Sequence, residues 1–185
     1  MDASALLALA LACAPQVAPS TVRALVATES AFNPWAIGVV GGRLDRQPRT
    51  RAEALATAHA LRAAGWNFSV GLGQINLGNF QRLGLALDSA FEPCANLKAM
   101  QAVLTDCMGR ITRSPISQAG QTSQADQTSL RKTLSCYYSG NFVTGFEHGY
   151  VRRVAAAVAT AATPSPLASV QAAHSRPTAP PKELP

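Results

Sequence analysis

The sequence predicts an α+β fold that is predominantly helical and carries a small β-hairpin. Of the 185 residues, 48% are hydrophobic and only 14% are charged, which suits a compact domain with a sizeable core. Apolar residues recur at helical spacing in most segments of the chain. One short segment around residue 40 instead has the apolar run and glycine pair that are typical of a hairpin.

The first predicted helix is the apolar run Ala5–Cys13, which ends before Pro15. No basic residue precedes this short run, so it is a poor signal peptide, and it is far too short to span a membrane. We interpret it as a core helix. We therefore expect a chain with no transmembrane segment and no clear signal peptide.

The second predicted helix opens with Ser20 as a serine cap and runs to about Phe32, where Asn33-Pro34 stops it. Glu29 shares its face with three apolar residues, Val22, Leu25 and Val26. Burial penalises the charged form of a carboxyl group, so the pKa of Glu29 should rise. A carboxyl group kept protonated near neutral pH suits a general acid in glycoside cleavage. The alternative is a buried structural glutamate that pairs with an arginine or caps a backbone amide.

The hairpin is predicted over Trp35–Leu44, turning at its glycine pair. A helix follows over Arg51–Ala64, with Gly65 as its C-terminal cap. Phe68–Asn76 is punctuated by glycines, which let another backbone or a ligand approach closely.

Three further helices complete the domain, over Asn96–Arg110, Gln127–Tyr138 and Glu147–Ala161. Ile111–Asp126 is rich in Ser, Gln and Gly and is predicted to be a surface loop. Prolines crowd the chain after Thr163, where large hydrophobic residues are scarce. We therefore expect one domain over residues 1–162 and a disordered Pro/Ala-rich tail over residues 163–185.

The cysteines are Cys13, Cys94, Cys107 and Cys136, and their spacing is not that of a metal site. With no histidine pair at metal spacing either, we expect no metal and no cofactor. Well-separated cysteines suggest disulfides formed in an oxidising envelope compartment. Cys94 and Cys107 bracket one helix about 20 Å apart, so each would have to pair with Cys13 or Cys136. The alternative is that some are simply small buried hydrophobic residues.

The formal net charge is +6, which fits an anionic polymer such as cell wall, a membrane surface or nucleic acid. The arginines are scattered, and basic and aromatic residues do not alternate. We therefore expect no binding of nucleic acid.

Three segments carry the candidate chemistry: Glu29-Ser30-Ala-Phe-Asn33-Pro34-Trp-Ala-Ile37-Gly38, Val70-Gly71-Leu72-Gly73-Gln74-Ile75-Asn76 and Ser135-Cys136-Tyr137-Tyr138-Ser139-Gly140-Asn141. Together and in this order they resemble the lytic transglycosylases of the soluble-transglycosylase and goose-type-lysozyme superfamily. That family has Glu-Ser at a helix end, then Gly-Leu-Met-Gln-Ile-Asn, then Ala-Tyr-Asn-Ala-Gly. The resemblance implies a lysozyme-like fold.

A narrower resemblance rests on the Cys-Ala-Pro-x-Val-Ala-Pro lead-in, the Val-Val-Gly-Gly segment, Phe91–Leu97 and Gly149-Tyr150-Val151. These segments look like the transglycosylase subunit of type IV secretion systems, the VirB-type assembly. The resemblance covers about residues 10–155. It implies a periplasmic enzyme whose partners are peptidoglycan strands and secretion-system components, and we expect it to be a monomer.

The resemblance implies that Glu29 is the sole catalytic acid and base. It would cleave the MurNAc-β-1,4-GlcNAc bond and form 1,6-anhydro-MurNAc, opening the wall locally for assembly of the secretion machinery. The candidate substrate-binding residues are Ser30, Gln74, Asn76, Tyr137 and Tyr150. Each has a structural alternative: a local hydroxyl-to-backbone bond, a tight bend whose amides fix loops, or core tyrosines with satisfied hydroxyl groups.

Two residues depart from the superfamily pattern: Gly73 replaces Met, and Tyr138 replaces Asn. Both put substrate fit in question more than the reaction class. Two other functions stay open. One is a hydrolase of the same fold that uses a second carboxylate such as Asp45 to activate water. The other is a wall-binding scaffold without activity.

Overall fold

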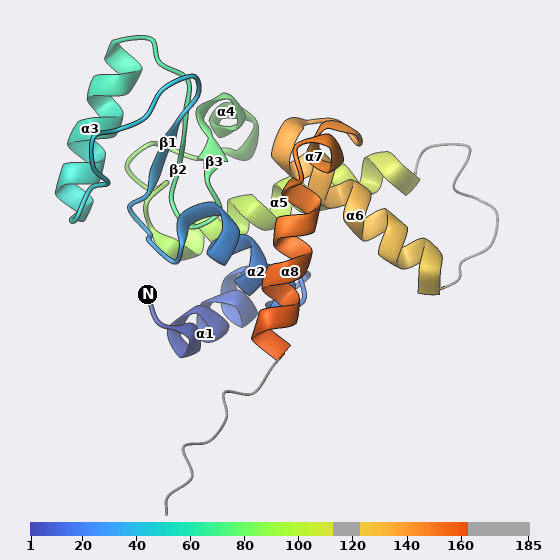
Figure 1. Cartoon of the computed structure of the whole chain (residues 1–185). Helices are drawn as coiled ribbons and strands as arrows, with labels where there is room; N and C mark the ends of the chain where they lie inside the picture. The colour runs from blue at the N-terminus through green and yellow to red at the C-terminus, as the bar shows by residue number, and fades with distance from the viewer. Residues whose placement is uncertain (113–122, 163–185) are drawn as a thin grey trace, which may run out of the picture.

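The structure is a computed structural model, which describes residues 1–112 and 123–162 (Figure 1). The described chain is mainly helical, which confirms the predicted α+β class. Its α-helices are α1 (Ala3–Cys13), α2 (Pro19–Ser30), α3 (Arg51–Ala63), α4 (Phe80–Leu83), α5 (Pro93–Thr112), α6 (Ser123–Ser139), α7 (Thr144–Glu147) and α8 (Tyr150–Ala162). The other elements are β1 (Ile37–Val39), β2 (Phe68–Val70), β3 (Ile75–Asn76) and the 3-10 helix η1 (Leu77–Asn79).

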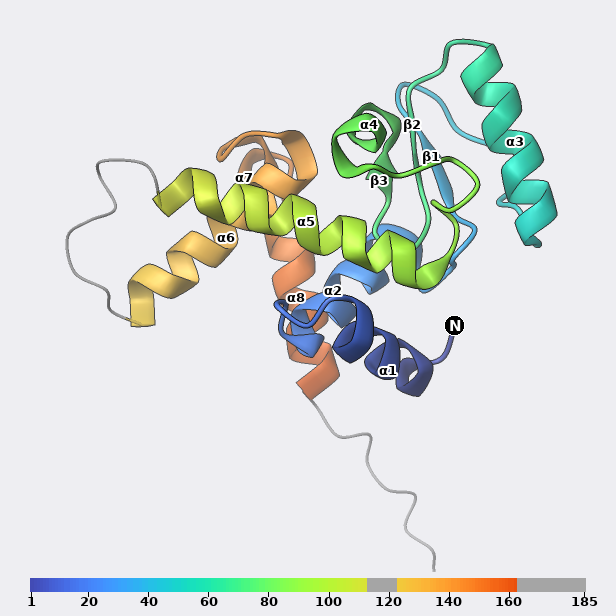
Figure 2. The same ribbon diagram turned by 180° about the vertical axis from the view of Figure 1, so that it is seen from behind.

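The molecule has two sides that α5 connects. The sheet, α3 and α4 form one side, and α1, α2 and α6 to α8 form the other (Figure 1). From behind, α5 runs from the sheet to α6 (Figure 2), and it contacts both β3 and α6. A helix that reaches both sides fixes the walls of any cleft between them.

Helix α2 packs against α1 and α8 through a buried apolar face. Val22, Leu25 and Val26 are fully buried, as the helical spacing predicts. The predicted serine cap is wrong: Ala18 is the N-cap, and Pro19 occupies the first turn. Proline suits this position because its missing N–H would have no partner there.

The predicted local hairpin is also wrong, because β1 pairs with β2 instead of with the residues that follow its glycine pair. The sheet is antiparallel in the order β1-β2-β3, with Ile37 opposite Val70 and Val70 opposite Ile75. On the other edge of β1, the Gln47 side chain accepts from the Ile37 N–H at 2.8 Å and donates to its carbonyl at 2.9 Å. A side-chain amide thus takes the place of the expected strand.

The turn between β2 and β3 is fixed by Asn96, which is fully buried on α5. Its amide donates to the carbonyls of Val70 at 3.0 Å and Ala90 at 2.8 Å, and its oxygen accepts from the Gly73 N–H at 2.7 Å. Gly71 has φ +77°, and a Cβ there would lie 2.3 Å from the Asn96 amide nitrogen. Gly71 therefore leaves room chiefly for the Asn96 side chain, where the sequence predicted another backbone or a ligand.

Two disulfides join the helices, Cys13–Cys94 and Cys107–Cys136. The first ties α1 to the start of α5, and the second ties α5 to α6. Both pairings agree with the prediction that Cys94 and Cys107 cannot bond to each other.

The last predicted helix begins later than expected, at Tyr150 in α8, because Gly149 adopts φ +67° just before it, and the short α7 was not predicted. The predicted loop over Ile111–Asp126 is shorter than expected, since α5 extends to Thr112 and α6 begins at Ser123. The rest of that loop and the predicted tail lie outside the described residues. Within the described residues, no helix is long and apolar enough to cross a membrane.

Candidate active site

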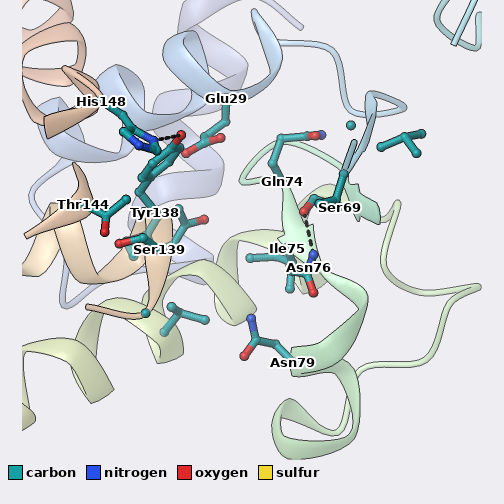
Figure 3. Close-up of a pocket in the computed structure, with 16 residues that line it drawn as sticks. Glu29, Ser69, Gln74, Ile75, Asn76, Asn79, Tyr138, Ser139, Thr144 and His148 are labelled. Carbon is teal, nitrogen blue, oxygen red and sulfur yellow. Dashed lines mark hydrogen bonds between the residues drawn. The ribbon is translucent and has the colours of Figure 1, made fainter. Parts of the chain in front are cut away.

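A cleft of about 670 Å³ opens between the two sides of the molecule, with Glu29 at the C-terminal end of α2 among its lining residues. Figure 3 shows its two walls. One wall comes from the sheet and η1, and its labelled residues are Ser69, Gln74, Ile75, Asn76 and Asn79. The other comes from α6, α7 and the segment after α7, with Tyr138, Ser139, Thr144 and His148.

Glu29 lies against Tyr150, the first residue of α8. The Tyr150 hydroxyl donates a hydrogen bond to Oε1 of Glu29. Burial raises the pKa of Glu29 to about 7, although the Tyr150 hydrogen bond and the positive charge of Arg153 each favour the carboxylate. Desolvation is the larger effect, so the group is poised to hold or release a proton near neutral pH.

Tyr137 lies beside this pair on α6 and lines the cleft. Its hydroxyl donates to the carbonyl oxygen of Gly73, and burial raises its pKa well above the ordinary value. A Cβ on Gly73 would lie 2.9 Å from the Tyr137 hydroxyl and 3.2 Å from Met100. The space that the superfamily methionine would need is therefore taken by Tyr137 and Met100, which accounts for the glycine.

Gln74 lies at the base of the sheet wall in a left-handed backbone conformation, with φ +48°. Its amide nitrogen donates to the carbonyls of Ala36 at 3.1 Å and Gly71 at 3.0 Å. A Cβ on Gly38 would lie 2.7 Å from the Gln74 side-chain oxygen, so Gly38 leaves room for this side chain over β1. The amide is thereby fixed with its side chain in the cleft lining.

Asn76 also lines the cleft, and its side chain is held at both ends. Its amide nitrogen donates to Asn67 at 2.9 Å and to the Ser69 hydroxyl at 3.3 Å. Its oxygen accepts from the Gly78 N–H at 2.9 Å. Gln74 and Asn76 therefore do both things that the sequence offered as alternatives. Their amides fix the neighbouring loops, and their side chains also line the cleft.

Two candidates do not line the cleft: Tyr150 reaches it only through its bond to Glu29, and Ser30 has no such link. Ser30 is the candidate that the structure places away from the cleft. It is buried, and its hydroxyl donates to the Val26 carbonyl one turn back at 3.1 Å. This is the local hydroxyl-to-backbone bond that the sequence left as the alternative. The two tryptophans that flank the turns, Trp35 and Trp66, are also absent from the lining.

Tyr138 and His148 also line the cleft, although neither was a predicted substrate-binding residue. The Tyr138 hydroxyl lies 3.2 Å from Nδ1 of His148. The departure from the superfamily asparagine at Tyr138 was the one available signal. His148 gave none, because its place depends on the turn at Gly149.

Glu29 is the one acidic residue in the cleft lining formed by the described residues. Asp45, the candidate second carboxylate, is exposed and lies outside that lining. In the same part of the chain, no group of three or more His, Cys, Asp or Glu side chains could hold a metal ion. The arrangement therefore offers one carboxyl group suited to proton transfer, hydrogen-bonded to a tyrosine and lining the cleft.

Comparisons with known proteins show the family of the chain. The family model of the Transglycosylase SLT domain matches residues 7–157. The chain is 46% identical to the type IV secretion system protein virB1 of Brucella suis, over 89% of this chain and 67% of that protein. It is 48% identical to the Brucella abortus protein of the same name, over 81% of this chain and 62% of that protein.

A third relative, protein virB1 of Agrobacterium tumefaciens, is 39% identical over 77% of this chain and 56% of its own length. The chain thus spans about two thirds or less of the length of these curated relatives. No solved structure matches it significantly. Because the family model covers most of the chain and the relatives share up to 48% identity, the chain belongs to the transglycosylase SLT family, whose lysozyme-like α+β fold it adopts.

Proposed function

We propose that this protein is a peptidoglycan lytic transglycosylase that cleaves the MurNAc-β-1,4-GlcNAc bond and leaves 1,6-anhydro-MurNAc. One observation carries the proposal: a single buried carboxyl group, Glu29, has its pKa raised to about 7 within an open cleft. A reaction in which one group acts first as an acid and then as a base needs a group whose pKa lies near the working pH. Membership of the SLT family supports the reaction class.

In the first step, protonated Glu29 gives its proton to the glycosidic oxygen, and the bond to C1 of MurNAc breaks. Positive charge develops at C1 as the GlcNAc hydroxyl leaves. The Glu29 carboxylate then takes the proton from the C6 hydroxyl of MurNAc while that oxygen attacks C1. The Tyr150 hydrogen bond and Arg153 stabilise the carboxylate between the two steps.

The cleft walls supply groups suited to a glycan. Amides and hydroxyls that both donate and accept hydrogen bonds suit sugar hydroxyls and N-acetyl groups. Gln74, Asn76 and Tyr137 are our candidates for this role, with Tyr150 acting through Glu29. We do not assign Ser30 a direct contact with substrate, since its hydroxyl is bonded inside α2.

The relatives named as type IV secretion proteins support a place in the cell envelope, where the enzyme would open the wall for a secretion machine. The formal net charge of +6 favours attraction to an anionic wall. Secretion-system components are therefore the proposed protein partners. Two disulfides fit an oxidising compartment such as the periplasm.

A hydrolase of the same fold is the second candidate, but the described cleft favours it less. A hydrolase that inverts the sugar needs a second carboxylate about 6.5–9.5 Å from the acid to activate water. Asp45 is exposed and outside the described lining, so it is badly placed for this task. A scaffold without activity would have no need of a protonated Glu29.

Mass spectrometry of the muropeptides released from purified sacculi tests the proposal. We expect anhydro-MurNAc products from the wild-type protein, none from Glu29→Gln, and an unchanged yield from the matched acidic control Asp45→Asn. Products with a reducing MurNAc end that disappear in Asp45→Asn would establish the hydrolase instead. Binding to sacculi without release of any product would favour the scaffold.

A further inference from the structure

Tyr138 covers one face of the tyrosine that bonds to Glu29. The rings of Tyr138 and Tyr150 are stacked, with centroids 4.6 Å apart and an interplanar angle of 18°. Tyr138 is 42% exposed and lines the cleft, whereas Tyr150 is only 2% exposed. The Tyr138 ring thus lies at the cleft surface against Tyr150.

His148 holds Tyr138 from a second direction. Its Nδ1 lies 3.2 Å from the Tyr138 hydroxyl, and the two rings meet edge to face with centroids 5.9 Å apart. His148 is in turn fixed through its backbone, because Arg153 donates to its carbonyl oxygen at 3.0 Å. Figure 3 shows the two side chains together on the wall beside Glu29.

On the basis of the proposed function, we propose that Tyr138 is a positioning residue for the catalytic pair: its ring holds Tyr150 against Glu29 and excludes water from their hydrogen bond, and His148 keeps that ring in place. The asparagine of the superfamily pattern is too small and too polar to stack in this way. The role is therefore specific to chains that carry an aromatic residue here.

The physical consequence concerns the desolvation of Glu29. Burial is the effect that raises its pKa to about 7, and the titratable or charged groups around it are Tyr150, Tyr137 and Arg153, with His148 beyond Tyr138. Removal of the Tyr138 ring lets water reach Tyr150 and Glu29 while these groups stay. The pKa of Glu29 then falls toward its ordinary value of 4.5.

A titration of Glu29 tests the proposal without relying on activity. The carboxyl carbons of ¹³C-glutamate-labelled protein are followed by NMR from pH 3 to pH 9, and Glu29→Gln identifies the signal of Glu29. We expect Tyr138→Phe, which keeps the ring, to retain the wild-type pKa. We expect Tyr138→Asn to lower it, and the exposed-aromatic control Trp66→Asn to leave it unchanged. We expect His148→Ala, which removes the contact that keeps the Tyr138 ring in place, to lower the pKa of Glu29 as well.

Kinetics on sacculi supply the second readout. Tyr138→Asn should lower kcat about tenfold, with a smaller change in KM, and should move the alkaline limb of the pH–rate profile to lower pH. An unchanged Glu29 pKa in Tyr138→Asn overturns the proposal even if activity falls, because Tyr138 would then act as a substrate contact.

If Tyr138→Asn does not fold, Tyr138→Leu is used as a second variant without a stacked ring. An unchanged pKa of Glu29 in Tyr138→Leu would then overturn the proposal. Different results would refute the proposed function and the proposed role of Tyr138. A wild-type protein that releases no anhydro product refutes the proposed function, whereas the NMR titration still decides the role of Tyr138.

Discussion

The hydroxyl of Tyr150 donates a hydrogen bond to Oε1 of Glu29 across 121 positions of sequence. This bond joins the first residue of α8 to the last turn of α2, and it is partly buried beside the cleft. Its effect on Glu29 opposes that of burial, because a donated hydrogen bond favours the carboxylate. The result is a carboxyl group that can exist in either protonation state near neutral pH.

The first prediction concerns the pH dependence of the rate. The acid step needs protonated Glu29, so the rate should fall about tenfold per pH unit once the pH exceeds the pKa, which is about 7. Muropeptide release measured between pH 3 and pH 9 checks this, with sacculus binding measured at each pH to exclude loss of affinity. An alkaline limb near pH 4.5 would show that Glu29 is not desolvated during the reaction.

The second prediction concerns stability. The folded-state pKa of Glu29, about 7, exceeds the unfolded value of 4.5, so the folded state binds the proton more tightly. The contribution of Glu29 to the free energy of unfolding is therefore fully present below pH 4.5. It is lost as the pH rises through 7, by about 3 kcal/mol in total. Glu29→Gln has no charge to bury and should remove this dependence.

Urea unfolding of both proteins at pH 4.5 and pH 8 measures the difference. The two proteins should be similar in stability at pH 4.5, and Glu29→Gln should be the more stable at pH 8. Equal stability at both values would mean that Glu29 is not desolvated in the folded protein.

The third prediction concerns Asn96, which orders the turn that carries Gln74. Asn96→Ala leaves the N–H of Gly73 and the carbonyls of Val70 and Ala90 without their buried partner. We expect the free energy of unfolding to fall by about 3 kcal/mol, because unsatisfied buried backbone groups lose their full solvation. Chemical denaturation measures the change.

Asn79→Ala is the matched control, since Asn79 is only partly buried and its oxygen accepts one bond, from Arg82 at 3.1 Å. It should change stability by less than about 0.5 kcal/mol. A similar loss in both variants would mean that the Asn96 network does not specifically stabilise the turn.

The sequence predicts the helical part of the site well, because helix periodicity is local. The spacing of Val22, Leu25 and Val26 places Glu29 on the apolar face of α2, where burial raises its pKa. The motif around Tyr137 likewise places a tyrosine in the cleft lining. The first inference depends only on residues within one helix, whereas the second rests on the family resemblance of three segments taken together.

The sheet and the aromatic wall were harder to predict, because they depend on contacts between distant segments. The glycine pair after β1 forms a turn, yet Gln47 occupies the strand edge that a local hairpin would use. The stack of Tyr138 on Tyr150 requires α6 and α8 to meet, and no periodicity within either helix reports this. Pairing across long separations is set by tertiary packing.

The fourth prediction separates the roles of the two disulfides. Cys13–Cys94 closes a sequence separation of 81 and Cys107–Cys136 one of 29. Loss of the longer loop closure should therefore destabilise the protein by about 1 kcal/mol more than loss of the shorter one, on the chain-entropy account.

Activity should show the reverse order. Cys136 directly precedes Tyr137 and Tyr138, so its bond to Cys107 fixes the end of α6 that forms the cleft wall. At a temperature where both double-alanine variants are folded, Cys107→Ala/Cys136→Ala should lose more muropeptide release than Cys13→Ala/Cys94→Ala. Activity losses that simply follow the losses of stability would refute a positioning role for the Cys107–Cys136 bond. In that case both disulfides would serve the fold alone.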